Sequence, residues 1–176
     1  MKSFSILLLI LLFSCKSGKD ISNPEQDLLS PAVVEMVKLL IETDYIGTES
    51  IGRSQEPSPA YASREALLSL ATEAELLALI DHPEGEVAAT AFEGLVRKNY
   101  GDLKTQLLNL SKGDRTLRYI QGDMVFTLPA IEYAYVNILG NEMEGNYIEN
   151  TRVDIGLSNA EKAFVENRIK AIRQTI

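Results

Sequence analysis

Apolar positions recur at helical spacing along much of the chain. After Pro31, apolar side chains return every three or four residues up to about Thr43, which places them on one face of an α-helix. Ser58-Pro59 opens a second helix, and the T-x-x-E sequence from Thr72 to Glu75 is a capping box that opens a third. Residues 44–58, which contain Gly47, Gly52 and Pro57, predict a connecting loop.

Residues 86–100 form the clearest predicted helix. On a helical wheel its apolar side chains fall on one half, and the other half carries Glu86, Thr90, Glu93 and Arg97. Glu93 and Arg97 also form a favourable i, i+4 pair, worth a few tenths of a kcal/mol. This pattern predicts an amphipathic helix.

The second half of the chain predicts further helices separated by less regular segments. Asp102 can cap one helix, and the capping box that starts at Ser158 opens the last one. Residues 127–139 predict a helix that is apolar almost all round, which is typical of a buried helix. Residues 140–157 predict a polar loop. The periodicity changes at residues 116–126, where a small hairpin and an irregular loop both fit. Together these elements predict an all-α, or mostly α, fold.

The N-terminus has the layout of a secretory signal peptide. Lys2 precedes an apolar run from Phe4 to Phe13, which is too short to span a bilayer because a spanning helix needs roughly 20 residues. We therefore expect residues 1–14 to be a removable signal, residues 15–23 to be a flexible tether, and residues 24–176 to form a single domain. A short buried helix in a cytosolic protein is the alternative.

Leu12-Phe13-Ser14-Cys15 resembles the lipobox of bacterial lipoproteins. The resemblance implies that Cys15 carries a diacylglyceryl group and becomes the acylated first residue, which anchors the protein to a membrane. Ordinary secretory cleavage would instead leave Cys15 as a free thiol. Cys15 is the only cysteine, and lipidation explains a lone cysteine in an exported chain. Lys16 replaces the aspartate associated with inner-membrane retention in some bacteria, so we expect the outer membrane.

Residues 76–96 resemble a HEAT repeat. Leu76, Leu79 and Ile80 match its first helix, Asp81 and Pro83 its turn, and a second helix rich in alanine follows. Ala88 and Gly94 depart from the residues usual in the family. The whole chain is similar to small HEAT-like lipoproteins of diderm bacteria, with which it shares the lipobox and the stretch Tyr45-Ile46-Gly47. The resemblance implies antiparallel helical pairs and a concave protein-binding surface rather than catalysis.

The charge of the chain narrows the choice of partners. A formal net charge of −8 repels nucleic acid and anionic lipid headgroups, so we expect no nucleic-acid partner. Such a surface suits a solvated domain beside a membrane or a domain that meets a basic partner.

The stretch GTESIGRS, residues 47–54, differs by one residue from the phosphate-binding P-loop. A P-loop follows a strand, opens a helix directly and uses a lysine. Here a predicted helix precedes the stretch, Arg53 stands in place of the lysine, and Gln-Glu-Pro-Ser-Pro follows. We therefore interpret it as a connecting loop, and no nucleotide or other cofactor is expected.

Two titratable residues are candidate functional groups, and each also has a structural interpretation. His82 is the only histidine, and Asp81-His82-Pro83 fits turn chemistry better than a metal or catalytic site. Glu132 lies at the edge of an apolar helix face, where a partly buried carboxyl could act as an acid with a raised pKa. Otherwise it is a first-turn glutamate or a partner of Arg115 or Arg118.

The remaining acidic segment does not predict a metal site. Residues 141–146, NEMEGN, lack the ligand spacing of a calcium loop, so we interpret them as a solvated loop.

Three functional hypotheses follow. The first is a membrane-tethered, extracytoplasmic module that binds a protein partner. The second is an acidic periplasmic inhibitor of a basic protein, which the net charge motivates. The third is a hydrolase-type enzyme that uses Glu132 with a second carboxylate. The absence of an evident catalytic set in the sequence favours binding over catalysis.

Overall fold

The computed structural model describes residues 28–143 and 152–176. The expected signal peptide, tether and lipidated Cys15 lie outside these ranges. Helices account for most of the described chain, and η2 is a π-helical segment. In chain order they are α1 (Pro31–Thr43), α2 (Pro59–Leu70), α3 (Glu73–Leu79), α4 (Gly85–Lys98), α5 (Leu103–Leu110), α6 (Ala130–Glu132), η2 (Tyr133–Ile138) and α7 (Asn159–Arg173).

The expectation of an all-α fold is wrong, because the helices accompany a four-stranded mixed sheet. Its strands are β1 (Ile46–Ile51), β2 (Glu56–Pro57), β3 (Thr116–Gly122) and β4 (Met124–Pro129), in the order β2-β1-β3-β4. β1 runs parallel to β3, with Ile46 opposite Tyr119, whereas β1 and β2 pair antiparallel, as do β3 and β4. The central pairing joins segments that lie far apart in the sequence.

The predicted loop 44–58 holds β1, a turn and β2. Gly47 lies in the strand, where an added Cβ would come within 2.9 Å of the Ser58 Oγ, and Gly52 has a φ of 73° in the turn. The two glycines therefore serve a close approach and a tight turn within a sheet edge. The stretch 47–54 lies in β1 and the turn after it, and it does not lead directly into a helix, because α2 begins at Pro59.

The hairpin interpretation of residues 116–126 is confirmed, and the hairpin is longer than predicted. Residues 127–129 belong to β4 rather than to a helix. The helical segment begins at Ala130, whose N–H donates to the Arg115 carbonyl 2.8 Å away, and continues as the buried η2. Pro129, the last residue of β4, marks the change from extended to helical backbone.

Local capping signals are confirmed at four helix starts. Ser58 accepts a hydrogen bond from the Tyr61 N–H, and Asp102 accepts one from Thr105. Both predicted capping boxes form, at Thr72 and at Ser158. Side chains thereby satisfy backbone donors at the first turns of α2, α3, α5 and α7.

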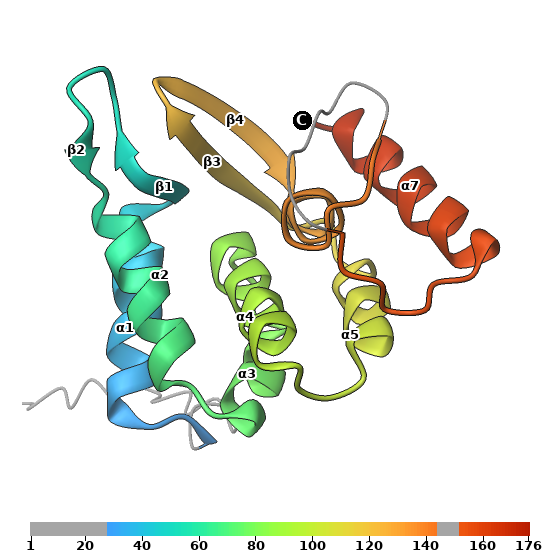
Figure 1. The fold of residues 1–176 in the computed structure, drawn as a ribbon, viewed down its shortest axis with the longest axis horizontal. Coiled ribbons are helices and arrows are strands. Elements are labelled where there is room, and N and C mark those ends of the chain that lie inside the picture. The colour runs from blue at the N-terminus through green and yellow to red at the C-terminus, as the bar shows by residue number, and fades with distance from the viewer. Residues whose placement is uncertain (1–27, 144–151) are drawn as a thin grey trace, which may run out of the picture.

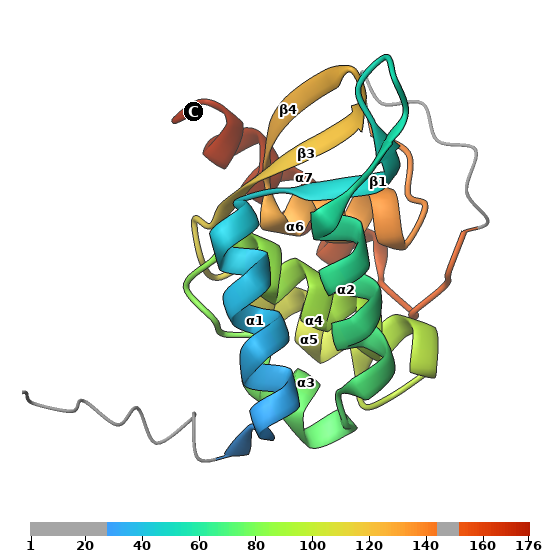
Figure 2. The same cartoon turned by 90° about the vertical axis from the view of Figure 1, so that its left-hand side faces the viewer.

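The helix α4 lies at the centre of the molecule. In Figure 1, α1 and α2 flank it on one side, α5 lies on the other, and the strands cross above it. Figure 2 shows α1 and α2 side by side below β1, with α4 and α5 behind them. Contacts join α4 to α1, α2, α3, α5, α6, η2 and β3. Every residue from Gly85 to Leu95 is buried, so this helix organises the single hydrophobic cluster of the described chain.

Two glycines of α4 test this close packing. An added Cβ at Gly85 would collide with the backbone carbonyl of Thr116 in β3. At Gly94 it would meet terminal methyls of flexible side chains, those of Leu76 at 2.8 and 2.9 Å and one of Leu68 at 3.2 Å. We expect Gly85→Ala to lower the free energy of unfolding by about 1–3 kcal/mol through overpacking. Gly94→Ala should be close to neutral, because alanine gains helix propensity of roughly 1 kcal/mol. Urea denaturation of both variants measures the difference, and equal losses would contradict it.

Candidate functional site

The described His82 takes part in turn structure. Its Nδ1 accepts a hydrogen bond from the Glu84 N–H at 3.1 Å, and its carbonyl accepts one from Arg115 Nη1 at 3.0 Å. Arg115 also donates to the carbonyl of Ile80. These bonds hold the α3–α4 turn against the start of β3, which is the structural role that the sequence predicted for this residue.

Glu132 is fully buried and forms an ion pair with Arg173 of α7. Arg173 donates from Nε at 2.7 Å and from Nη2 at 2.5 Å, so both carboxylate oxygens are engaged. Arg118 pairs with Asp44, and Arg115 donates to backbone carbonyls. The described contacts of Glu132 therefore join α6 to the C-terminal helix, and the carboxylate faces the protein interior instead of solvent.

The acidic segment 141–146 is described only as far as Met143. In the described ranges, no group of three or more His, Cys, Asp or Glu side chains is arranged to hold a metal ion. No described helix is long and apolar enough to cross a membrane.

The most unusual polar arrangement lies between α2 and α4. Arg64 of α2 and Glu93 of α4 are only 8% and 7% exposed, and Arg64 Nη1 lies 3.5 Å from Glu93 Oε2. Arg64 Nη1 also donates to the Tyr133 hydroxyl at 2.9 Å. Burial of charged groups is costly unless each finds partners, so these contacts fix the relative positions of α2, α4 and η2.

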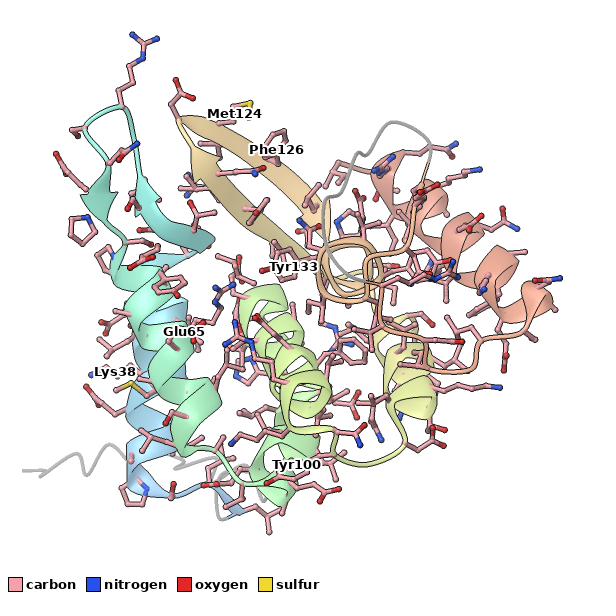
Figure 3. All side chains as sticks on the ribbon, in the orientation of Figure 1. Lys38, Glu65, Tyr100, Met124, Phe126 and Tyr133 are labelled. Atoms are coloured by element: carbon pink, nitrogen blue, oxygen red, sulfur yellow. The ribbon has the colours of Figure 1, made fainter. Side chains whose placement is uncertain are left out.

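A second, more exposed layer of charges covers this pair. Arg97 donates to both oxygens of Glu65, at 2.8 and 2.9 Å, and to Glu93 at 2.6 Å. Glu65 points from α2 towards α4 in Figure 3. Arg64, Glu65, Glu93 and Arg97, which we call the charged network, thus contain two cations and two anions and are balanced in charge.

Part of the charged network lacks hydrogen bonds. Arg64 Nε, Glu93 Oε2 and the nearby Thr90 Oγ1 are buried, and no described group makes a hydrogen bond with them. An unsatisfied buried polar atom costs roughly 1–3 kcal/mol, so the network is held by the fold around it. It contains no nucleophile with an adjacent base, and its chemistry is that of ion pairing.

Aromatic side chains continue from the charged network to the hairpin. The Tyr119 ring of β3 lies 5.4 Å from the Tyr133 ring and stacks on Phe126 of β4 at 6.3 Å. Burial raises the pKa of Tyr133, and burial likewise raises the pKa of Tyr119, so both hydroxyls stay protonated at neutral pH. The base of the hairpin is therefore fixed to the core through these rings.

The hairpin tip, in contrast, is apolar and exposed. Met124, Val125 and Phe126 are 53%, 56% and 38% exposed. Figure 3 shows Met124 and Phe126 on the hairpin above Tyr133. We call Met124, Phe126 and Tyr119, together with the partly exposed pair Glu65 and Arg97 of the charged network, the recognition face.

Sequence reasoning missed this site for identifiable reasons. The helical wheel puts Glu93 and Arg97 on the polar half of α4. In the structure that half faces α2 and the sheet, and its residues up to Glu93 are buried. Arg64 was not singled out, since an Arg-Glu pair in a short helix is typical of an exposed surface. The exposed apolar tip depends on the tertiary position of β4, which the predicted helix at 127–139 obscured.

Comparisons with known proteins do not assign this chain to a family. The chain matches no protein-family model, no curated protein and no solved structure. The similarity to HEAT-like lipoproteins remains a prediction.

The charged network makes a prediction about coupled stability. Arg64→Met removes the hydrogen bond to the Tyr133 hydroxyl and the buried cation beside Glu93, which then pairs only with the partly exposed Arg97. It should lower the free energy of unfolding by roughly 3 kcal/mol. Arg64→Met combined with Glu93→Met replaces the ion pair by apolar side chains of similar volume, while Arg97 keeps Glu65. The double variant should therefore be more stable than Arg64→Met alone. Urea denaturation of the single and double variants measures the coupling, and simply additive losses would contradict it.

The ion pair of Glu132 makes a second prediction. Arg173→Met removes both hydrogen bonds from a fully buried carboxylate and should cost roughly 3–5 kcal/mol. Arg168→Met, in the same helix, removes an ion pair with the exposed Asp114 and a hydrogen bond to the Ser111 carbonyl, and should cost about 1–2 kcal/mol. Thermal and urea unfolding of the two variants compare them. Equal decreases in the free energy of unfolding for the two variants would contradict the prediction that the buried ion pair of Glu132 stabilises the fold more than the exposed pair of Asp114.

Proposed function

We propose that this protein is a membrane-tethered, extracytoplasmic module that binds a protein partner through the recognition face. The exposed hairpin tip carries the proposal. Met124 and Phe126 are exposed on one face of a strand whose base is fixed in the core, and Val125 is exposed on the opposite face. Contiguous exposed apolar residues bordered by polar groups are typical of protein-interaction sites.

The chemistry of the recognition face favours a polypeptide ligand. Phe126, stacked on Tyr119, offers an aromatic anchor of the kind that dominates binding energy in interfaces. Glu65 and Arg97 lie at the partly exposed edge of the charged network and can pair with charges of either sign at the rim. The recognition face lies on the sheet, α2 and α4, rather than on the concave helical surface that the HEAT resemblance implies.

The tether rests on the sequence. Lipidation at Cys15 would hold the domain at the outer membrane, and the net charge of −8 would keep it away from anionic headgroups while favouring a partner with basic groups.

A capture experiment in the native host tests the proposal. Membranes from cells that express the tagged protein are crosslinked gently, and captured proteins are identified by mass spectrometry. We expect one dominant envelope protein with the wild-type chain. Phe126→Ser should reduce its capture roughly tenfold or more, since truncating an aromatic anchor costs about 2 kcal/mol.

Two further variants separate the parts of the proposal. Leu70→Ser changes a 53% exposed apolar side chain at the end of α2, away from the recognition face, and should leave capture unchanged. Cys15→Ala should remove the protein from the membrane fraction and lower capture. Undiminished capture by Phe126→Ser would refute the recognition face, and a Cys15→Ala variant that stays at the membrane would refute the lipid tether.

A further inference from the structure

The two edges of the sheet are protected very differently. The β2 edge is two residues long, contains Pro57 and carries the charge of Glu56. The β4 edge is six residues long and reads MVFTLP, without any charged residue. Short strands, prolines and charges are the usual means by which an edge avoids pairing with another chain. Only the β2 edge uses all three.

The backbone of β4 offers free hydrogen-bonding groups at defined positions. Because Ala130 donates to Arg115 next to the strand, the antiparallel alternation directs the N–H and C=O of Leu128, Phe126 and Met124 towards β3. The backbone groups of Val125 and Thr127 therefore point to the outer edge. No described residue bonds to them.

We infer that the outer edge of β4 pairs with β4 of a second copy of this chain, antiparallel and about a twofold axis beside Phe126. In this register Val125 lies opposite Thr127 of the second copy, and each such pair exchanges both of its outward bonds. Pro129 has no N–H to donate, so the ladder ends there. With the axis at Val125 or Thr127, one of these residues would instead lie opposite Asp123 or Pro129. The axis at Phe126 is the register that pairs every outward N–H and C=O of both Val125 and Thr127.

The side chains favour a second copy over an unrelated strand. With the axis at Phe126, Met124 lies opposite Leu128 of the second copy and the two Phe126 side chains face each other, so apolar groups meet apolar groups along one face. No charged residue falls within the paired segments. A contact that repeats itself about a twofold axis closes after two copies and does not grow into a fibre.

The helix α7 contacts β4, and its C-terminal end lies beside the strand. The second copy's tip would approach this end, where Ile176 is exposed. The pairing would also join the two recognition faces, since Met124 and Phe126 of both copies would share one face of a continuous sheet. A single strand edge buries less than the roughly 1,000 Å² of a stable interface, so the dimer is weak and depends on concentration.

Engineered disulfides test the register directly. The full chain carries Cys15→Ser and is kept in mild detergent, so that an introduced cysteine is the only thiol. Across the axis, the Cα atoms at position 126 of the two copies would lie about 4.5 Å apart, within the range of a disulfide. The Cα atoms at position 124 would lie roughly 13 Å apart, four residues along the strands. Under mild oxidation, Phe126→Cys should therefore crosslink at least about tenfold faster than Met124→Cys.

Sedimentation of the same purified chain, without introduced cysteines, tests the free association. We expect a monomer–dimer equilibrium that shifts with concentration. Val125→Pro should abolish it, because proline removes an outward N–H while the bonds between β3 and β4 remain. Val125→Thr is the matched control and should dimerise, and circular dichroism should be unchanged in both.

Two results would overturn the inference. One is a wild-type chain that stays monomeric at all concentrations, together with a Phe126→Cys variant that does not crosslink. The other is Met124→Cys crosslinking as fast as Phe126→Cys, which would show association without this register. These measurements use no partner protein, so their failure is distinct from failure of the capture experiment, and Phe126-dependent capture with a monomeric chain would assign the β4 edge to the partner.

Discussion

The burial of α4 on all sides is the constraint on which the rest of the structure depends. A helix that is buried on all sides must find hydrogen-bond or ion-pair partners for its polar side chains within the protein, because water does not reach them. Glu86 accepts a hydrogen bond from the Arg118 N–H at 3.2 Å, and burial raises the pKa of its carboxyl. Glu93 finds Arg64 and Arg97. The polar side of α4 therefore determines where α2 and β3 can lie.

The sheet follows from the same packing. Gly85 allows the start of α4 to approach the backbone of β3, and the bond from Arg118 to Glu86 fixes the strand along the helix. Tyr133, which accepts from Arg64, then places the Tyr119 ring. The buried charges and the base of the hairpin form one continuous set of contacts, and the exposed tip extends beyond it.

The sequence predicted the parts of the fold that depend on neighbouring residues. The bounds of α1 and the caps at Ser58, Thr72, Asp102 and Ser158 are local signals, and all of them are found in the structure. The sheet depends on pairing between β1 and β3, which lie far apart in the sequence, so no local sequence pattern predicts that they pair. Gly47 in β1 and Gly52 in the turn after it therefore predicted a loop.

The candidate site was harder to predict, because a helical wheel reports the spacing of polar residues and not what lies opposite them. The spacing predicted Glu132 at the edge of the apolar side of its helix, and the structure buries its carboxylate fully. Its partner Arg173 comes from a helix about 40 residues later, which only tertiary structure brings close.

The apolar side chains at the base of the hairpin are packed in the protein, whereas those at its tip are exposed. At the base, Leu117 and Tyr119 contribute to the core, so their apolar character has a structural cause. Beyond Tyr119, nothing in the described chain covers Met124 or Val125, and polar residues there would leave the fold intact. The apolar side chains at the tip and the uncharged edge of β4 therefore have no evident role in stabilising the isolated domain. Because exposed apolar groups and open strand edges both favour association, the tip is the part of the surface where contact with another chain gains the most free energy.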